Sequence, residues 1–180
     1  MVKNYTIVID TLGSDQGPEA ILEGARLVLE AHDNVNLVIV GDEELIKNKN
    51  LDPNRIRIIH TNKTVTNYDN AVVAYYQSKN VSVFLALEEA SKTDAIGVIS
   101  AGNSGALIVG SIRYLMSKDR TRPCMSAVLP HTAGGFTCLV DTGASIDVGP
   151  QQLHDFARLG AKFMKVAYKI ENPRIGLLSN

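Results

Sequence analysis

The stretch YTIVIDTLGSDQGP (Tyr5–Pro18) decides the fold class of this chain. Its first six residues are mostly apolar and β-branched, which is typical of a short strand. Two glycines and two aspartates are then followed by Pro18, a favourable first helical residue, and by an apolar stripe over Pro18–Ala31. The stretch therefore predicts a strand, a polar loop and a helix, which is the repeating unit of α/β proteins.

The same alternation continues along the chain. Apolar runs predict strands over Tyr5–Asp10, Val35–Val40, Arg55–His60, Ala95–Ser100, Met125–Leu129, Phe136–Asp141 and Arg174–Leu178. Helical periodicity predicts helices over Pro18–Ala31, Glu43–Lys49, part of Tyr68–Lys92, Ser104–Ser117 and Pro150–Tyr168. Most of the strands are apolar on both faces, as in a parallel sheet covered by helices. The sequence thus predicts one α/β domain over residues 1–180, with three α-β-α layers and a mostly parallel sheet.

Two further features concern the second half of the chain. The turn-forming run Pro130–Gly135 predicts a hairpin between the strands on either side of it. Arg174–Leu178 has the pattern of an interior strand, yet no helix follows to cover it. We expect the chain to be interrupted there, the alternative being an ordinary ending on a last strand.

Composition excludes several classes of protein. The 180 residues carry 18 basic and 19 acidic side chains and are 45% hydrophobic, which excludes a disordered or low-complexity chain and gives no basic face for nucleic acid. No apolar run approaches the roughly 18 residues of a membrane span. We expect a cytoplasmic protein with no nucleic-acid partner, no membrane span and no peripheral membrane contact. Cys124 and Cys138 lie in apolar runs, so both are interpreted as reduced core residues.

Polar residues gather in three loops, each after a predicted strand and before a predicted helix: Asp10–Pro18, Ser100–Ala106 and Asp141–Pro150. In parallel sheets such loops converge at the carboxyl ends of the strands, where α/β proteins bind their ligands. The loop AGNSGA (Ala101–Ala106) carries the strongest signal, because its glycines, hydroxyl and amide let a phosphate approach backbone N–H groups at a helix start.

Other interpretations of these residues stay open. The loop after Ser100 lacks the Lys of a Walker loop and the glycine spacing of a dinucleotide site, so a capped turn without a ligand is the alternative. Asp15 is interpreted as a helix cap or loop brace rather than a catalyst. His131 and the other histidines show no ligand spacing and no nucleophile beside them, so no metal site is expected.

Eight landmarks together resemble the phosphate acyltransferase (PlsX) family of bacterial phospholipid synthesis. They occur in family order over nearly the whole chain, and as a set they are highly specific. They are Asp10–Pro18, Val40–Glu43, Asp94–Ala95, Ser100–Ala106, Arg122–Pro123, Leu129–Pro130, Asp141–Asp147 and Asn172–Leu178.

The resemblance implies a fold similar to isocitrate dehydrogenases and phosphotransacetylases, a homodimer, no cofactor, and transfer of an acyl group from acyl-acyl-carrier protein to inorganic phosphate. It also implies that the three polar loops form the phosphate pocket, with the four aspartates shaping it and Gly102–Gly105 giving the phosphate and oxyanion contacts. The candidate substrate-binding residues are Ser100, Gly102, Asn103, Ser104, Gly105, Asp10, Gly13, Asp15, Asp141, Gly143 and Asp147.

The chain also departs from the family pattern. Family members are roughly twice as long, so this chain is expected to correspond to their first half. Where they carry a Lys-Pro and a basic run, this chain has Asn70–Lys79 with a single lysine, and Gly149-Pro150 replaces a later Lys-Pro. The alternative functions are a non-catalytic module that binds a phosphorylated ligand or acyl-carrier protein, and acyl transfer with coenzyme A.

Overall fold

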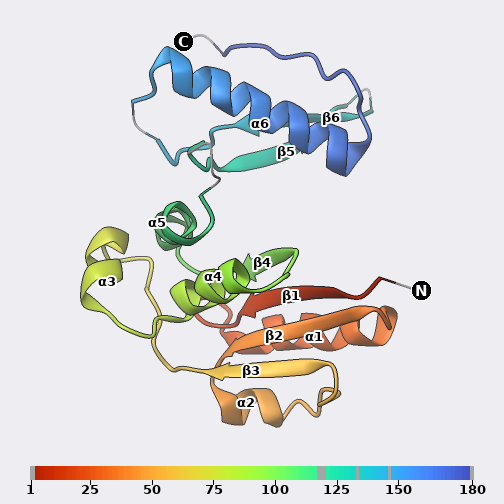
Figure 1. The fold of residues 1–180 in the computed structure, drawn as a ribbon, viewed down its shortest axis with the longest axis vertical. Coiled ribbons are helices and arrows are strands. Elements are labelled where there is room, and N and C mark those ends of the chain that lie inside the picture. The colour runs from red at the N-terminus through yellow and green to blue at the C-terminus, as the bar shows by residue number, and fades with distance from the viewer. Residues whose placement is uncertain (1–2, 117–120, 133, 146, 179–180) are drawn as a thin grey trace. The chain divides into compact units, whose positions relative to one another are not determined.

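The computed structural model describes residues 3–116, 121–132, 134–145 and 147–178. The chain divides into two compact units, Met1–Leu115 and Met116–Asn180. The first unit contains β1 (Tyr5–Asp10), α1 (Pro18–Ala31), β2 (Val35–Gly41), α2 (Glu43–Lys47), β3 (Ile56–His60), α3 (Ala71–Gln77), α4 (Ser82–Lys92), β4 (Gly97–Ser100) and α5 (Ser104–Tyr114). The second contains β5 (Ser126–Pro130), β6 (Phe136–Val140) and α6 (Pro150–Tyr168) (Figure 1).

The first unit is built on a parallel four-stranded sheet. Its strand order is β3-β2-β1-β4, and β1 pairs with β2 on one side and with β4 on the other. The chain therefore adds strands in one direction up to β3 and then returns to the opposite side of β1. That reversal places a switch point between the carboxyl ends of β1 and β4, where open α/β sheets bind ligands.

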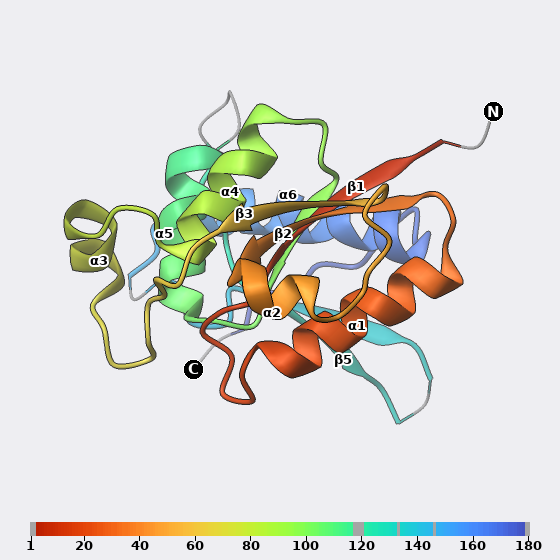
Figure 2. The same ribbon diagram turned by 90° about the horizontal axis from the view of Figure 1, so that it is seen from below.

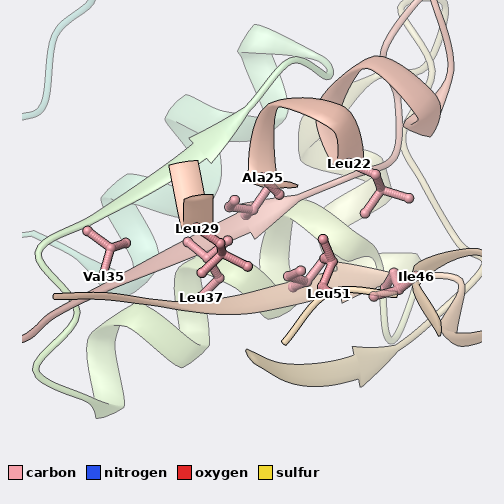
Figure 3. Packing of buried hydrophobic residues seen from close by; sticks show 9 residues of the cluster. Leu22, Ala25, Leu29, Val35, Leu37, Ile46 and Leu51 are labelled. Atoms are coloured by element: carbon pink, nitrogen blue, oxygen red, sulfur yellow. The ribbon is translucent and has the colours of Figure 1, made fainter. Parts of the chain in front are cut away.

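Helices cover both faces of this sheet, as Figure 2 shows for α1 and α4. On one face Leu22, Ala25 and Leu29 of α1 pack with Leu37 and Ile39 of β2 (Figure 3). These positions recur at the spacing of an amphipathic helix, so the α1 stripe is buried while its other face meets solvent. Truncating the fully buried Leu22 to Ala would cost about 2–5 kcal/mol.

The opposite face is covered by α4, and α5 packs on α4. Val8, Val38 and Val40 of the sheet form a cluster with Ala86 of α4. Gly110 lets α5 pack closely against α4, because a Cβ at this position would lie 2.4 Å from Leu87 Cδ1 of α4. The α/β class and its three layers, predicted from the apolar strands, are confirmed in this unit.

The second unit is a β-hairpin covered by a helix. β5 and β6 pair antiparallel, with Val128 opposite Cys138, which confirms the predicted hairpin. α6 packs on β6 at Gly160, where an added Cβ would lie 3.2 Å from Val140 Cγ2. The aromatic rings of Phe136 and Tyr168 lie 5.0 Å apart, at the C-terminal end of α6.

Two sequence-based interpretations need correction, and a third is made more precise. Arg174–Leu178 forms no strand, because its backbone makes no ladder bonds and Leu177 and Leu178 are largely exposed. The Tyr68–Lys92 region holds two helices, α3 and α4, separated at Ser78–Val81. Cys124 and Cys138 are free thiols but only partly buried rather than core residues.

A single domain over residues 1–180 stays a prediction. No helix in the described ranges is long and apolar enough to cross a bilayer.

Candidate functional site

The first two polar loops meet at the carboxyl ends of β1 and β4. Asp10 and Ser100 are register partners at the ends of these neighbouring strands. The loop after each strand therefore starts from the same edge of the sheet, on either side of the switch point. This much of the predicted convergence follows directly from the strand order.

Asp10 joins the two loops by hydrogen bonds. Its Oδ1 accepts from the Leu12 N–H at 3.1 Å, and its Oδ2 accepts from the Ser100 hydroxyl at 2.8 Å. The Gly102 N–H in turn donates to Ser100 Oγ at 3.2 Å. The Asp10 carboxyl group, whose residue is 1% exposed, thus binds two donors directly and a third, the Gly102 N–H, through Ser100.

Burial dominates the electrostatics of this carboxyl. It raises the pKa of Asp10, and the Ser100 hydroxyl, the Ser82 hydroxyl and the Leu12 N–H oppose that rise without cancelling it. Ser82 is fully buried, and its Oγ has no hydrogen-bond partner among the described residues. Its influence on Asp10 is therefore that of a nearby dipole rather than of a well-formed hydrogen bond.

Two glycines let the loop backbones touch. Gly13 has a φ of +81°, and a Cβ there would lie 2.9 Å from Thr64 Oγ1 and 3.1 Å from Gly102 Cα. A Cβ on Gly102 would lie 3.2 Å from the Leu12 carbonyl oxygen. Both positions therefore need glycine for steric reasons, and Gly13 also for its backbone conformation.

The N-terminus of α5 leaves backbone donors unused. Asn103 caps the helix, since its Oδ1 accepts from the Ala106 N–H at 2.8 Å. The Gly102 and Ala106 amides are therefore occupied within the protein. The N–H groups of Asn103, Ser104 and Gly105 donate to no described residue. Such unpaired donors at a helix start attract anions.

The loop after β3 also reaches this site, which the sequence analysis did not predict. The Asn103 side chain donates to the Thr66 carbonyl at 2.8 Å, and Asn67 donates to Asp15 Oδ1 at 3.4 Å. Asp15 is thus a loop brace rather than the cap of α1, whose N-cap is Gly17. A signal was present in the sequence: the run TNKTVTN (Thr61–Asn67) is rich in hydroxyls and amides and directly follows a strand.

Positive charge is scarce in the three loops that meet at this edge of the sheet. The three loops 10–17, 61–70 and 100–105 contain one basic residue, Lys63. Its side chain is exposed, and its ammonium makes no ion pair with any described residue. Lys63 is therefore available to neutralise an anion bound to this part of the first unit.

The third predicted loop belongs to the second unit. Asp141 Oδ1 accepts from the Met125 and Ala144 N–H groups, each at 3.2 Å, while its Oδ2 is buried without a partner among the described residues. Gly143 has a φ of +113° with open space around it, and Asp147 is exposed. Among the described residues β6 pairs with β5 in a separate two-stranded sheet, so the convergence of this loop with the other two stays a prediction.

Between the hairpin and α6 lies an apolar cavity of about 270 Å³. Cys124 and Cys138 both line it, together with Leu159 and Phe163. Burial, Asp141 and Cys138 raise the pKa of the Cys124 thiol, so it stays protonated at neutral pH. No group of three or more His, Cys, Asp or Glu side chains within the described ranges could hold a metal ion.

Comparison with known proteins gives consistent matches over the chain. A family model described as "Fatty acid synthesis protein" matches residues 5–180. Proteins named phosphate acyltransferase are similar to it: one from Clostridioides difficile is 34% identical over 176 residues, covering 95% of this chain and 52% of the relative. Another, from Shouchella clausii, is 32% identical, covering 96% and 53%. A third, from Streptococcus pyogenes, is 34% identical, covering 97% and 52%. The chain spans about half the length of the curated relatives it matches.

Proposed function

This chain belongs to the fatty acid synthesis protein family, and from that membership we propose that it carries the phosphate-binding part of a phosphate acyltransferase. The family identified from the eight sequence landmarks is thereby confirmed. The proposed reaction transfers the acyl group of acyl-acyl-carrier protein to inorganic phosphate. A homodimeric and cytoplasmic protein stays a prediction that accompanies this function.

The observation that carries the proposal is the row of unpaired N–H groups on Asn103, Ser104 and Gly105. They lie at the start of an 11-residue helix, beside the switch point of the sheet. Backbone donors and the helix dipole there suit a phosphate dianion. Lys63, the one basic residue in the three loops that meet here, is proposed to assist them.

The chemistry sets what such a site must do. A phosphate oxygen forms a bond to the thioester carbonyl carbon, the C–S bond breaks, and the released thiolate takes up a proton. Fixed amides hold the phosphate in one orientation, which lowers the entropic part of the barrier. A donor is also needed for the oxyanion that develops on the carbonyl oxygen. Ser104 offers both an N–H and a hydroxyl at this position.

A phosphate titration of the ¹⁵N-labelled chain tests the proposal. Inorganic phosphate is expected to shift the amide resonances of Asn103, Ser104 and Gly105. Ser104→Pro removes one of these donors at the first helical position, where proline fits, and the extended backbone of Asn103 accepts a following proline. We expect phosphate affinity to fall about tenfold.

Glu43→Pro also places a proline at the first position of a helix, α2, where it removes an N–H that donates to His60 Nδ1 at 3.2 Å, and it should leave phosphate affinity unchanged. The proposal fails if phosphate perturbs none of the three amides, or if Ser104→Pro binds phosphate as well as the unchanged chain.

One observation favours a second candidate function, a non-catalytic module that binds a phosphorylated ligand or acyl-carrier protein. Lys63 is the one basic residue in the three loops around the amides, and each missing charge-assisted contact would weaken phosphate binding. An assay of acyl phosphate formation, run beside calorimetry with acyl-carrier protein, separates the two. Binding of acyl-carrier protein without turnover supports the module.

A further inference from the structure

Asp10 and Ser100 connect by hydrogen bonds to the Gly102 N–H, one residue before the proposed phosphate amides, and Ser82 lies near Asp10. Asp10 is 1% exposed and Ser82 is fully buried, so neither side chain can touch a ligand bound outside the loops. The Asp10 carboxyl group can nevertheless ionise in this buried position. A buried charge is energetically costly unless it is paired and hydrogen-bonded. The two Asp10 oxygens are bound to two different loops, by Leu12 and by Ser100.

We propose that Asp10 is a positioning residue, which holds Ser100 as the acceptor of the Gly102 N–H and thereby leaves the amides of Asn103 to Gly105 facing a phosphate. The inference rests on the proposed function and deepens it. It divides the candidate residues into those that meet the ligand and those that act behind it. Asp10, Ser100 and Gly13 belong to the second group.

The directions of the hydrogen bonds support this division. Ser100 has one proton, which it donates to Asp10 Oδ2 at 2.8 Å. Its oxygen is then free to accept the Gly102 N–H at 3.2 Å. A hydroxyl can serve as donor on one side and acceptor on the other, so the carboxylate decides which side is which. The Gly102 amide consequently stays inside the loop, and the turn that follows begins from a fixed point.

An amide cannot take over this task. Asp10 accepts a different donor on each oxygen, whereas an asparagine has one oxygen and one NH₂ group. If the asparagine oxygen faces the Leu12 N–H, its NH₂ faces Ser100, so the Ser100 hydroxyl loses Asp10 as the acceptor of its proton and must accept from both the NH₂ and the Gly102 N–H. If the amide is turned round, the NH₂ group opposes the Leu12 N–H. The first orientation therefore reverses the bond that fixes the Ser100 proton, and the second removes the bond to the Leu12 N–H.

Asp10→Asn therefore separates positioning from simple electrostatics. Removing a negative charge near an anion site would by itself tighten phosphate binding. Loss of the fixed loop instead weakens it, and we expect about tenfold weaker binding of inorganic phosphate. A decrease in phosphate affinity, rather than an increase, is the result that a purely electrostatic role would not produce.

The experiment compares four variants of the full chain by ¹⁵N-detected phosphate titration and by amide hydrogen exchange at Gly102 without ligand. Asp10→Asn and Ser100→Ala are expected to bind phosphate about tenfold more weakly and to exchange the Gly102 amide faster. Ser100→Thr keeps the hydroxyl and should restore both properties. Asp42→Asn makes the same substitution next to the neighbouring strand β2, where Asn caps α2 equally well, and should change neither.

The outcomes are separable. Wild-type affinity together with unchanged Gly102 exchange in Asp10→Asn overturns the inference, while the proposed function stands. If the unchanged chain binds no phosphate, the proposed function fails, and Gly102 exchange in the same variants still decides whether Asp10 orders the loop. Should Asp10→Asn not fold, Ser100→Ala against Ser100→Thr gives the same comparison.

Discussion

Asp10 and Asp141 stand at the carboxyl ends of two strands and bind their surroundings in different ways. Asp10 uses one oxygen for Leu12 and the other for Ser100 of the adjacent parallel strand. Asp141 uses a single oxygen for both Met125 and Ala144, and its second oxygen is buried without a partner among the described residues. In a parallel sheet a neighbouring strand ends beside the carboxylate and supplies a loop. In the hairpin the neighbouring strand β5 begins beside Asp141 instead of ending there. Asp141 therefore holds its own loop to the start of β5 and does not join two loops.

The largest expected effect tests this difference at the two glycines of these loops. Gly13→Ala places a Cβ against backbone and Thr64 at a φ of +81°, so we expect a loss of about 2–4 kcal/mol in the free energy of unfolding. Gly143→Ala has open space at a φ of +113° and should lose about 1 kcal/mol, from backbone strain alone. Urea titrations followed by circular dichroism measure both.

Hydrogen exchange assigns each loss to its own part of the chain. Gly13→Ala should speed exchange in β1, and Gly143→Ala in β6. Equal losses from the two substitutions would mean that the contact between the Gly13 and Gly102 loops contributes nothing to stability.

The sequence predicted that the loops after β1 and β4 meet, but it did not predict the contact made by the loop after β3. The patterns around Asp10 and Ser100 are local, and parallel neighbours follow from the α/β class. The hydrogen bond between Asn103 and Thr66 depends on the conformation of the loop after β3, which hydrophobic periodicity does not predict. The strand over Arg174–Leu178 was wrong for a related reason, because an apolar run becomes a strand only beside a partner.

The second prediction concerns the pH dependence of stability. Folding raises the pKa of Asp10 through burial, so the folded chain holds this proton more tightly than the unfolded chain. The carboxyl therefore contributes stability that is complete below its unfolded pKa of about 3.9 and is lost as pH rises through the folded value. Asp10→Asn lacks this loss. At acid pH the free energy of unfolding of Asp10→Asn should be about 1 kcal/mol lower than that of the unchanged chain, and this difference should shrink as pH rises.

Asp69 provides a control of opposite sign. Hydrogen bonds from the Thr66 N–H and hydroxyl lower the pKa of this exposed carboxyl. Its contribution is present above the unfolded pKa and is lost as pH falls through the folded value. Asp69→Asn should therefore lose stability relative to the unchanged chain as pH rises, whereas Asp10→Asn gains. Urea midpoints from about pH 2.5 to pH 7 measure both slopes, that of Asp69 mainly below the unfolded pKa of about 3.9 and that of Asp10 above it, and parallel slopes would contradict the assignment.

The smallest expected effect is a rate in the second unit. Burial is the main reason that the pKa of Cys124 is raised, and the charge of Asp141 adds to it. Asp141→Asn keeps the one oxygen that accepts both loop N–H groups, so the loop should stay folded while the charge is removed. Alkylation of Cys124 by iodoacetamide at pH 7 should become about two to three times faster, since the thiolate is the reacting form.

Asp147→Asn is the matched control, because it removes the same charge from an exposed position in the same loop. Mass spectrometry of the alkylated peptides should show no change in the Cys124 rate for this variant. An equal acceleration in both variants would mean that overall charge, rather than the buried oxygen of Asp141, acts on the thiol. A slower rate in Asp141→Asn would mean that the Asp141 loop had closed around Cys124, and the two aspartates would then differ less than their hydrogen bonds indicate.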